Sequence, residues 1–261
     1  MTEIERNLLP DERRRRILAL LQQARQLSVP ELASRLGVSQ ETVRRDLRRL
    51  DEQGLLRRVH GGAVPVQTTV EHPFRERLAT RRAEKERIGR FAAGLFEPGD
   101  SLMIDTGSTT LLFAEALAER RGMSVVTNSI DIARTLGRAN GRHDVVLIGG
   151  DFDPDTGSAL GPLAIEQIGR FRVDHVVLTI GAIDATQGFM DFRLDEAMVA
   201  AAMLRQGRTL TILADHTKFD RLAFALVCGF ERPLRLVTDA PPKRETQDAL
   251  RRQGVELLIA P

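Results

Sequence analysis

The sequence predicts two domains: a small helical domain that ends in a β-hairpin, and a larger α/β domain built on a largely parallel sheet. Within residues 8–66, three helical patterns follow one another across short connections, and a glycine-rich reversal comes after them. Across residues 82–261, short runs of β-branched residues alternate with helical patterns, which is typical of a parallel sheet with crossover helices. Residues 67–81 show no sustained periodicity, and we expect them to form a linker.

The composition is that of a globular protein, with 42% hydrophobic and 28% charged residues. No apolar run approaches the length of a membrane span, and the polar stretch from Met1 to Pro10 lacks the core of a signal peptide. Cys228 is the single cysteine, which excludes an intramolecular disulfide and a cysteine-based metal cluster. We therefore expect a cytoplasmic protein that has no membrane partner, no cofactor and no metal.

The charge of the chain is unevenly distributed. Residues 1–60 carry 13 Lys or Arg against 9 Asp or Glu, whereas residues 61–261 carry 25 against 27. A basic head on a slightly acidic body favours a polyanion as the partner of the head. A charged face that is simply solvated is the alternative for this bias taken alone.

The short connections in the head predict a helix-turn-helix. The first helical pattern runs from about residue 11 to residue 25. The second begins at Ser28, which forms a capping box with Glu31, and it ends at Gly37, a residue that tolerates a left-handed helix stop. A third helix is expected from Ser39 to about residue 53, and a turn this short sets two helices at a steep angle.

The third helix has one apolar and one arginine-rich face. Val43, Leu47 and Leu50 fall on one side at about 100° per residue, and the arginines lie opposite, while Asp46 is expected to orient one arginine. Arginines at the start of such a helix suit base edges and phosphates in a major groove, although a solvated face is the alternative. The residues that we expect to contact DNA, from this helix, its caps, the first helix and the hairpin, are Arg14, Ser28, Ser39, Gln40, Thr42, Arg44, Arg45, Arg48, Arg57, Arg58 and His60.

The hairpin after the third helix is predicted to be a wing. Residues 55–59 have the pattern of a strand, and Gly61 and Gly62 permit a tight reversal into Ala63 and Val64. Basic residues along the hairpin would contact phosphates, which position a protein on DNA without reading the sequence. A plain hairpin that caps the domain is the alternative.

Seven strands are expected in the body, at residues 101–105, 124–127, 144–148, 175–180, 210–213, 234–238 and 255–259. Several of them run into small or polar residues, and in open α/β sheets ligands bind outside the carboxyl ends of the strands. The residues that we expect to bind a small effector are Asp105, Gly107, Ser108, Thr109, Thr110, Thr127, Asn128, Gly149, Gly150, Gly181, Glu196, Asp215 and Lys218.

The strongest part of this predicted pocket is the stretch 105–110, Asp-Thr-Gly-Ser-Thr-Thr. Its hydroxyls, its glycine and the N–H groups that open the next helix suit a phosphate, whereas an ordinary N-cap is the alternative. Lys218 could add a cation and Asp215 a hydrogen bond to a hydroxyl. Glu196 begins a helix, where stabilisation of the helix dipole is an equally good reason for an acid, and Lys85 is expected to be a solvated lysine.

A family resemblance covers nearly the whole chain. The run VSQETVRRDLRRLDEQGLLRRVHGGA closely resembles the helix and wing signature of the DeoR family, and DTGSTT, VTNS, IGG, LGPLA and ADHTKF stand in the order of its effector domain. FRVDHVVLTIGAID and LADHTKF look most like the branch that contains the glycerol-3-phosphate regulon repressor. One departure is Ala200, which stands where many members have a lysine, so the effector or the cation that binds it is expected to differ.

The resemblance implies a sequence-specific transcriptional regulator with a winged helix-turn-helix and a Rossmann-like sensor domain similar to ribose-5-phosphate isomerase and CoA-transferases. It implies repression of a sugar or polyol catabolic operon, a double-stranded DNA operator, a phosphorylated sugar or polyol effector, and a homo-oligomer (dimer or tetramer). Two alternatives stay open: an architectural DNA-binding protein without a ligand, and an isomerase-like enzyme with a DNA-binding head. Acid–base residues for such an enzyme would come from Asp105, Asp184, Glu196, Asp215 and Lys218. The attached head and Ala200 favour the sensor over the enzyme.

Overall fold

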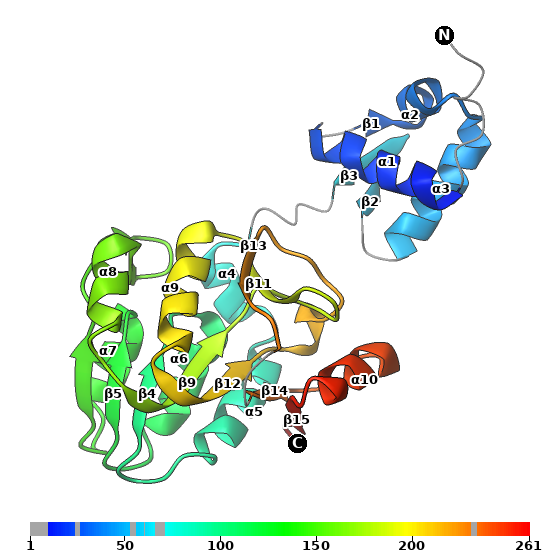
Figure 1. Cartoon of the computed structure of the whole chain (residues 1–261). Coiled ribbons are helices and arrows are strands. Elements are labelled where there is room, and N and C mark those ends of the chain that lie inside the picture. Colours follow the sequence, from blue (N-terminus) through cyan, green and yellow to red (C-terminus); the bar gives the residue numbers. More distant parts are fainter. Residues whose placement is uncertain (1–9, 24–26, 53–55, 60, 66–70, 231–233) are drawn as a thin grey trace. The chain divides into compact units, whose positions relative to one another are not determined.

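The chain forms two compact units, residues 1–68 and residues 69–261, which are shown in Figure 1. They are seen in a computed structural model, which describes residues 10–23, 27–52, 56–59, 61–65, 71–230 and 234–261. No helix among these residues is both long and apolar enough to cross a membrane.

The described part of the smaller unit is a bundle of helices closed by a small antiparallel sheet with the strand order β1-β3-β2. Its core includes Ile17, Leu32, Val43, Leu47 and Leu50, so the predicted apolar face of the third helix is buried. The two-residue strand β1, which sequence patterns did not reveal, pairs with β3. The elements are α1 (Pro10–Gln23), β1 (Leu27–Ser28), α2 (Val29–Leu36), α3 (Gln40–Glu52), β2 (Leu56–Val59) and β3 (Gly62–Pro65).

The caps predicted for the two helices of the helix-turn-helix are present. The Glu31 amide donates to Ser28 Oγ at 3.3 Å, and the Glu31 carboxylate accepts from the Ser28 amide at 2.8 Å. Gly37 ends α2 with a φ of 66°, and the Thr42 amide donates to Ser39 Oγ at 3.2 Å. At the hairpin, a Cβ on Gly62 would lie 2.3 Å from the Leu27 carbonyl oxygen, so the pairing of β1 with β3 requires glycine there.

The larger unit is built on a parallel sheet whose described strands have the order β15-β14-β12-β9-β4-β5-β6. All seven strands expected from the sequence are confirmed. Chain order therefore reverses between β4 and β9, which makes this pair of strands the topological switch point of a doubly wound sheet. The strands are β4 (Ser101–Ile104), β5 (Ser124–Thr127), β6 (Asp144–Leu147), β9 (Val173–Thr179), β12 (Gly207–Leu213), β14 (Leu234–Thr238) and β15 (Glu256–Ile259).

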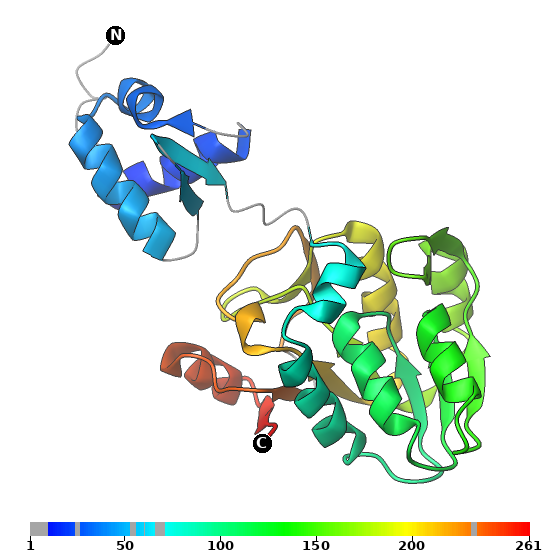
Figure 2. The same cartoon turned by 180° about the vertical axis from the view of Figure 1, so that it is seen from behind.

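Helices cover both faces of this sheet, and each face has its own core. Figure 1 shows α8 and α9 in front of the strands, and Figure 2 shows α5, α6 and α7 on the opposite face. Successive side chains of β4 point to the two sides: Leu102 and Ile104 pack with the helices of one face, and Met103 with those of the other. The helices are α5 (Arg82–Ala93), α6 (Ser108–Leu117), α7 (Ile130–Gly137), α8 (Gly161–Ile168), α9 (Leu194–Leu204) and α10 (Arg244–Arg252).

Smaller elements lie between these strands in sequence. A hairpin follows β6, a three-stranded sheet with the order β10-β11-β13 includes the chain that leaves β9, and a single 3-10 turn follows β12. These elements are β7 (Asp151–Asp153), β8 (Ser158–Leu160), β10 (Ala182–Asp184), β11 (Gly188–Asp191), β13 (Ala225–Cys228) and the turn His216–Lys218.

The larger unit begins earlier than the expected boundary at residue 82. A short helix, α4 (Phe74–Ala79), belongs to it, although these residues show no sustained periodicity in the sequence. The Phe74 ring is buried, and its amide donates to the Asp155 carboxylate at 3.1 Å. Residues that the sequence assigns to a linker are therefore part of the larger unit's structure.

Candidate functional site

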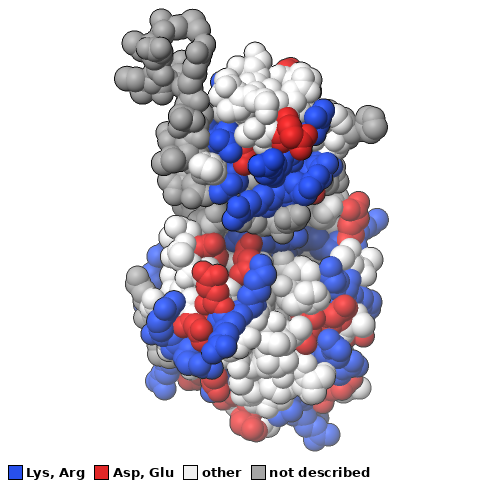
Figure 3. Space-filling model, turned by 90° about the vertical axis from the view of Figure 1, so that its right-hand side faces the viewer, with Lys and Arg blue, Asp and Glu red and all other residues white. Residues whose placement is uncertain are grey.

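The arginine face of α3 is the candidate DNA-contacting surface. Arg45 and Arg48 are exposed, and neither has an ion-pair or hydrogen-bond partner among the described residues. Arg44 is also exposed and lies 3.5 Å from the Glu41 carboxylate. Figure 3 shows Lys and Arg side chains gathered in a band on one side of the smaller unit, whereas positive and negative side chains are mixed over the larger one.

Two arginines of α1 are directed to a carboxylate of α3. Arg13 Nε donates to Asp46 Oδ2 at 2.5 Å, and Arg14 lies 3.6 Å from Asp46 Oδ1. Asp46 is only 4% exposed, so the pair fixes the packing of α1 on α3. Arg14, which we expected at the DNA, is thus engaged within the unit.

The other expected DNA contacts have different surroundings. The Ser28 and Ser39 hydroxyls accept hydrogen bonds as helix caps. Ser39 Oγ also shares a hydrogen bond of 2.9 Å with Thr42 Oγ1. Gln40 and Arg58 are exposed. The side chain of Arg57 and the whole of His60 lie outside the described residues.

In the larger unit, two adjoining cavities open at the carboxyl ends of β4 and β9, at the switch point. Asp105 joins these strands, because its carboxylate accepts from the Thr179 amide at 3.0 and 3.1 Å. Both cavities share Thr106, Asp191 and Glu196. The first is further lined by Glu71, Arg77, Ser108, Thr109, Thr156, Thr179, Ile180, Gly181 and Lys218, and the second by Asp105, Asn128, Leu160, Val199 and Ala200.

One side of the first cavity carries cations. Lys218 Nζ lies 3.6 Å from Glu71 Oε1, and an Arg77 guanidinium nitrogen lies 3.0 Å from Glu71 Oε2. Lys85, expected to be solvated, is buried instead: its Nζ donates to Ser108 Oγ at 3.0 Å and to the Arg77 carbonyl oxygen. Burial lowers the pKa of Lys85 to about 8, although the nearby Asp215 carboxylate opposes this.

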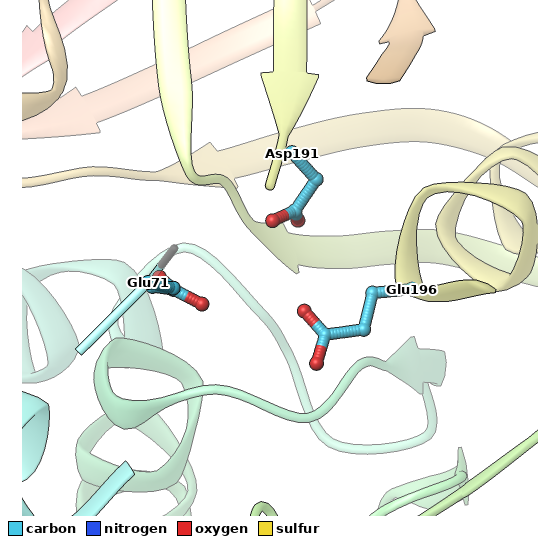
Figure 4. Close-up of side chains that lie close together, drawn as sticks. All are labelled: Glu71, Asp191 and Glu196. Carbon is cyan, nitrogen blue, oxygen red and sulfur yellow. The ribbon is translucent and has the colours of Figure 1, made fainter. Parts of the chain in front are cut away.

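Two acids, Asp191 and Glu196, line both cavities. Burial, with the added repulsion of Glu71, raises the pKa of Asp191 to about 7. Burial and the Asp191 charge raise the pKa of Glu196 to about 8, and burial raises the pKa of Asp105 well above its usual value. Figure 4 shows Glu71, Asp191 and Glu196 pointing toward a common space, from the residues before α4, the end of β11 and the first turn of α9.

The same three carboxylates could in principle hold a cation, because their ligand atoms lie within 4.8 Å of one another. Glu71 is already paired with Arg77 and Lys218, however, so cations of the chain balance part of this charge. We assign no metal to the cluster. Beside it, Asn128 Nδ2 donates to the Ala159 carbonyl oxygen at 3.1 Å, whereas its buried Oδ1 accepts from no described residue. This end of the site thus offers acceptors to a ligand that donates hydrogen bonds.

Several expected effector contacts lie outside the lining of the two cavities. A Cβ on Gly107 would lie 2.1 Å from the Thr179 methyl group, so this glycine permits packing between neighbouring strand ends. Thr110 Oγ1 donates to the Gly107 carbonyl oxygen, and Thr127 Oγ1 accepts from the Ser129 amide. The remaining residues of this kind are Gly149 and Gly150, which turn the chain after β6, and Asp215, whose carboxylate accepts from Thr217 at 2.5 and 3.0 Å.

The structure also brings in residues that sequence reasoning missed or left aside. Glu71 and Arg77 come from the supposed linker, and Thr156 from the hairpin of β7 and β8. The only sign of Glu71 and Arg77 in the sequence is that they are charged residues in a stretch that shows no periodicity.

Each of the two units matches a known protein family. The DeoR-like helix-turn-helix domain family matches residues 13–69, and the DeoR C terminal sensor domain family matches residues 80–240. The HTH-type transcriptional repressor CsqR of Escherichia coli (strain K12) is 31% identical over 259 residues, which cover 99% of this chain and 97% of that protein. The glycerol-3-phosphate regulon repressor of the same organism is 32% identical over 246 residues, which cover 94% of this chain and 97% of that protein.

Among solved structures, ribose 5 phosphate isomerase A from Neisseria gonorrhoeae matches 57% of this chain and 56% of its own, with a TM-score of 0.38 and 17% sequence identity. This likeness is too distant to carry a functional argument. The family matches span both units, and the two relatives are repressors that align over almost their full length. The chain therefore belongs to the DeoR family of helix-turn-helix transcriptional repressors.

Proposed function

We propose that this repressor controls a sugar or polyol catabolic operon and that a small phosphorylated sugar or polyol binds at the switch point of its larger unit. The observation that carries the proposal is the polarity of the site. Lys218 and Arg77 line the first cavity, whereas the second is lined by no cation of the described residues and by Asp105, Asn128 and the two acids that it shares with the first. A ligand with an anion at one end and hydroxyl donors at the other fits this arrangement.

Within this proposal, each end of the ligand has its own set of partners. Lys218 and Arg77 bind the phosphate, and Ser108 and Thr109, at the N-terminus of α6, add hydroxyl and amide donors. The hydroxyls of the ligand donate to the carboxylates and amide oxygen at the other end. Ala200, which lines this second end, adds no cation there.

On the DNA side, we propose that α3 enters the major groove with Arg45 and Arg48 at base edges. Arg44 and Arg58 would contact phosphates on either side, which fixes position and leaves sequence reading to the helix. The exposure of these side chains supports this, whereas Arg14 is better regarded as a structural partner of Asp46.

Repression also requires paired heads on a symmetric operator, so we propose that copies of the chain associate through the larger unit. Three large apolar residues on this unit are about half exposed: Leu163 of α8 (54%), and Leu194 (57%) and Met198 (52%) of α9. Measuring molar mass in solution for the wild type and for Met198→Glu tests this association. A monomeric wild-type protein would contradict it.

Thermal unfolding of the full chain tests the effector. The probes are glycerol 3-phosphate, glucose 6-phosphate and fructose 6-phosphate, each beside its unphosphorylated parent. A bound probe at about 100 times its Kd stabilises the folded protein by about 2.7 kcal/mol, or about 5–10 °C for a unit of this size. We expect Lys218→Ala to abolish this shift and Lys243→Ala, an exposed lysine on the surface, to retain it.

Two outcomes would count against the proposal. Equal shifts with a phosphate and its parent would show that the cations do not select the ligand. No shift with any of these probes would remove the support for a phosphorylated effector and leave the DNA-binding function alone.

A further inference from the structure

Glu71 is an anion of the chain itself that occupies the cationic side of the cavity. It lies three residues after the boundary between the two units. Its carboxylate contacts Arg77 at 3.0 Å and Lys218 at 3.6 Å, and its side chain is only 13% exposed. Glu71 therefore satisfies the same two cations that the proposed phosphate would need.

A phosphate and Glu71 cannot share this position at low cost. A phosphate monoester brings up to two negative charges, and the Glu71 carboxylate already lies within 4.8 Å of ligand atoms of Asp191 and Glu196. Placing the phosphate beside the Glu71 carboxylate in this largely buried site would add repulsion without adding a cation. The low-energy solution is exchange, in which the phosphate takes Arg77 and Lys218 and Glu71 leaves.

The chain around Glu71 limits what this exchange moves. Phe74, at the start of α4, stays attached through its buried ring and its hydrogen bond to Asp155. Lys85 holds the Arg77 carbonyl oxygen further along the same helix. The contacts that the phosphate would break therefore lie ahead of α4, on the side that leads to the DNA-binding unit.

We propose that Glu71 is an internal competitor of the effector phosphate: it holds the start of the larger unit on the cavity and is released when the phosphate binds. This inference rests on the proposed function. It couples effector binding to the position of Glu71, because the effector then binds only the state in which Glu71 has left Arg77 and Lys218. Effector binding thereby frees Glu71, which lies three residues after the boundary between the two units.

The direct test is Glu71→Gln, which keeps the shape of the side chain and removes the competing charge. Calorimetric titration of the full chain with inorganic phosphate and with glycerol 3-phosphate should show a Kd about tenfold lower for the variant than for the wild type. Glu76→Gln is the matched control, because Glu76 lies on α4 and is exposed to solvent beside His72. We expect its Kd to equal that of the wild type.

Hydrogen exchange provides a second test, on the wild type alone. Amide hydrogen exchange around residue 71 should become faster when phosphate is added, while exchange in β4 and β9 becomes slower or stays unchanged.

The outcomes separate this inference from the function on which it rests. If the wild type binds a phosphorylated probe and Glu71→Gln binds it equally or more weakly, the competitor role is wrong and the effector site stands. Slower exchange around residue 71 with phosphate would also overturn the inference. If neither protein binds any probe, the proposed effector site fails, and the competitor role fails with it.

Discussion

Replacing Glu196 by glutamine should stabilise the larger unit, and the gain should grow as the pH rises. In the folded protein the pKa of Glu196 is about 8, against a usual value of 4.5, because the side chain is buried and faces Asp191 and Glu71. The folded state therefore holds this proton more tightly than the unfolded state. The stabilisation that the bound proton provides is complete below about pH 4.5 and is lost as the pH rises to about 8.

The size of this effect follows from the same difference in pKa. At about 1.4 kcal/mol per pH unit, ionising Glu196 in the folded protein costs at most about 5 kcal/mol. Partial contact of the side chain with water reduces this cost, so we expect about 2 kcal/mol between pH 5 and pH 8.5. For a unit of this size the corresponding change in Tm is about 4–8 °C.

Thermal unfolding of the full chain without effector, at both pH values, measures this gain. Glu196→Gln removes the titrating group, so its Tm should exceed that of the wild type by several degrees more at pH 8.5 than at pH 5. Glu166→Gln is the control, since Glu166 is exposed on α8 and pairs with Arg170. A Tm difference between Glu196→Gln and the wild type that is the same at both pH values would refute the reasoning.

Three further predictions concern the smaller unit. Gly62→Ala should destabilise it by about 1–3 kcal/mol in a urea titration, because the new Cβ would lie 2.3 Å from the Leu27 carbonyl oxygen, and an unchanged urea midpoint would contradict this. Asp46→Asn should lower the urea midpoint of this unit by removing the carboxylate that pairs with Arg13 and Arg14, at a cost of about 1–3 kcal/mol, and an unchanged midpoint would contradict the packing role. Arg45→Ala should weaken operator binding by about 1–3 kcal/mol in a gel-shift titration, more on the operator than on unrelated DNA; an equal loss on both would make Arg45 a phosphate contact.

The elements that sequence patterns predicted are those set by local rules. Ser28 and Gly37 mark the two ends of α2, because helix capping needs only neighbouring residues. The seven strands of the larger unit are visible in the sequence as short runs of β-branched residues. The two-residue strand β1 has no pattern of its own and exists because Gly62 lets β3 approach it.

The candidate site was only partly predictable, because its residues meet through tertiary structure. The loop at Ser108 and Thr109 could be recognised from its strand, its hydroxyls and the following helix. Glu71 and Arg77 could not, since α4 is too short to show a helical period and its place depends on the burial of Phe74. Whether Lys85 is solvated or buried depends likewise on the neighbours that α5 meets in the folded unit.

The strand order of the larger unit also has a consequence for synthesis of the protein. Among the described residues, the smaller unit draws its core from residues 17–63, whereas β9 must pair with both β4 and β12, and Lys218 follows β12. On the ribosome, the DNA-reading unit can therefore complete its fold while much of the sensor is still untranslated. A message broken before the codons for β12 would yield a chain with the complete sequence of the DNA-reading unit and a larger unit that lacks β12, β14, β15 and Lys218.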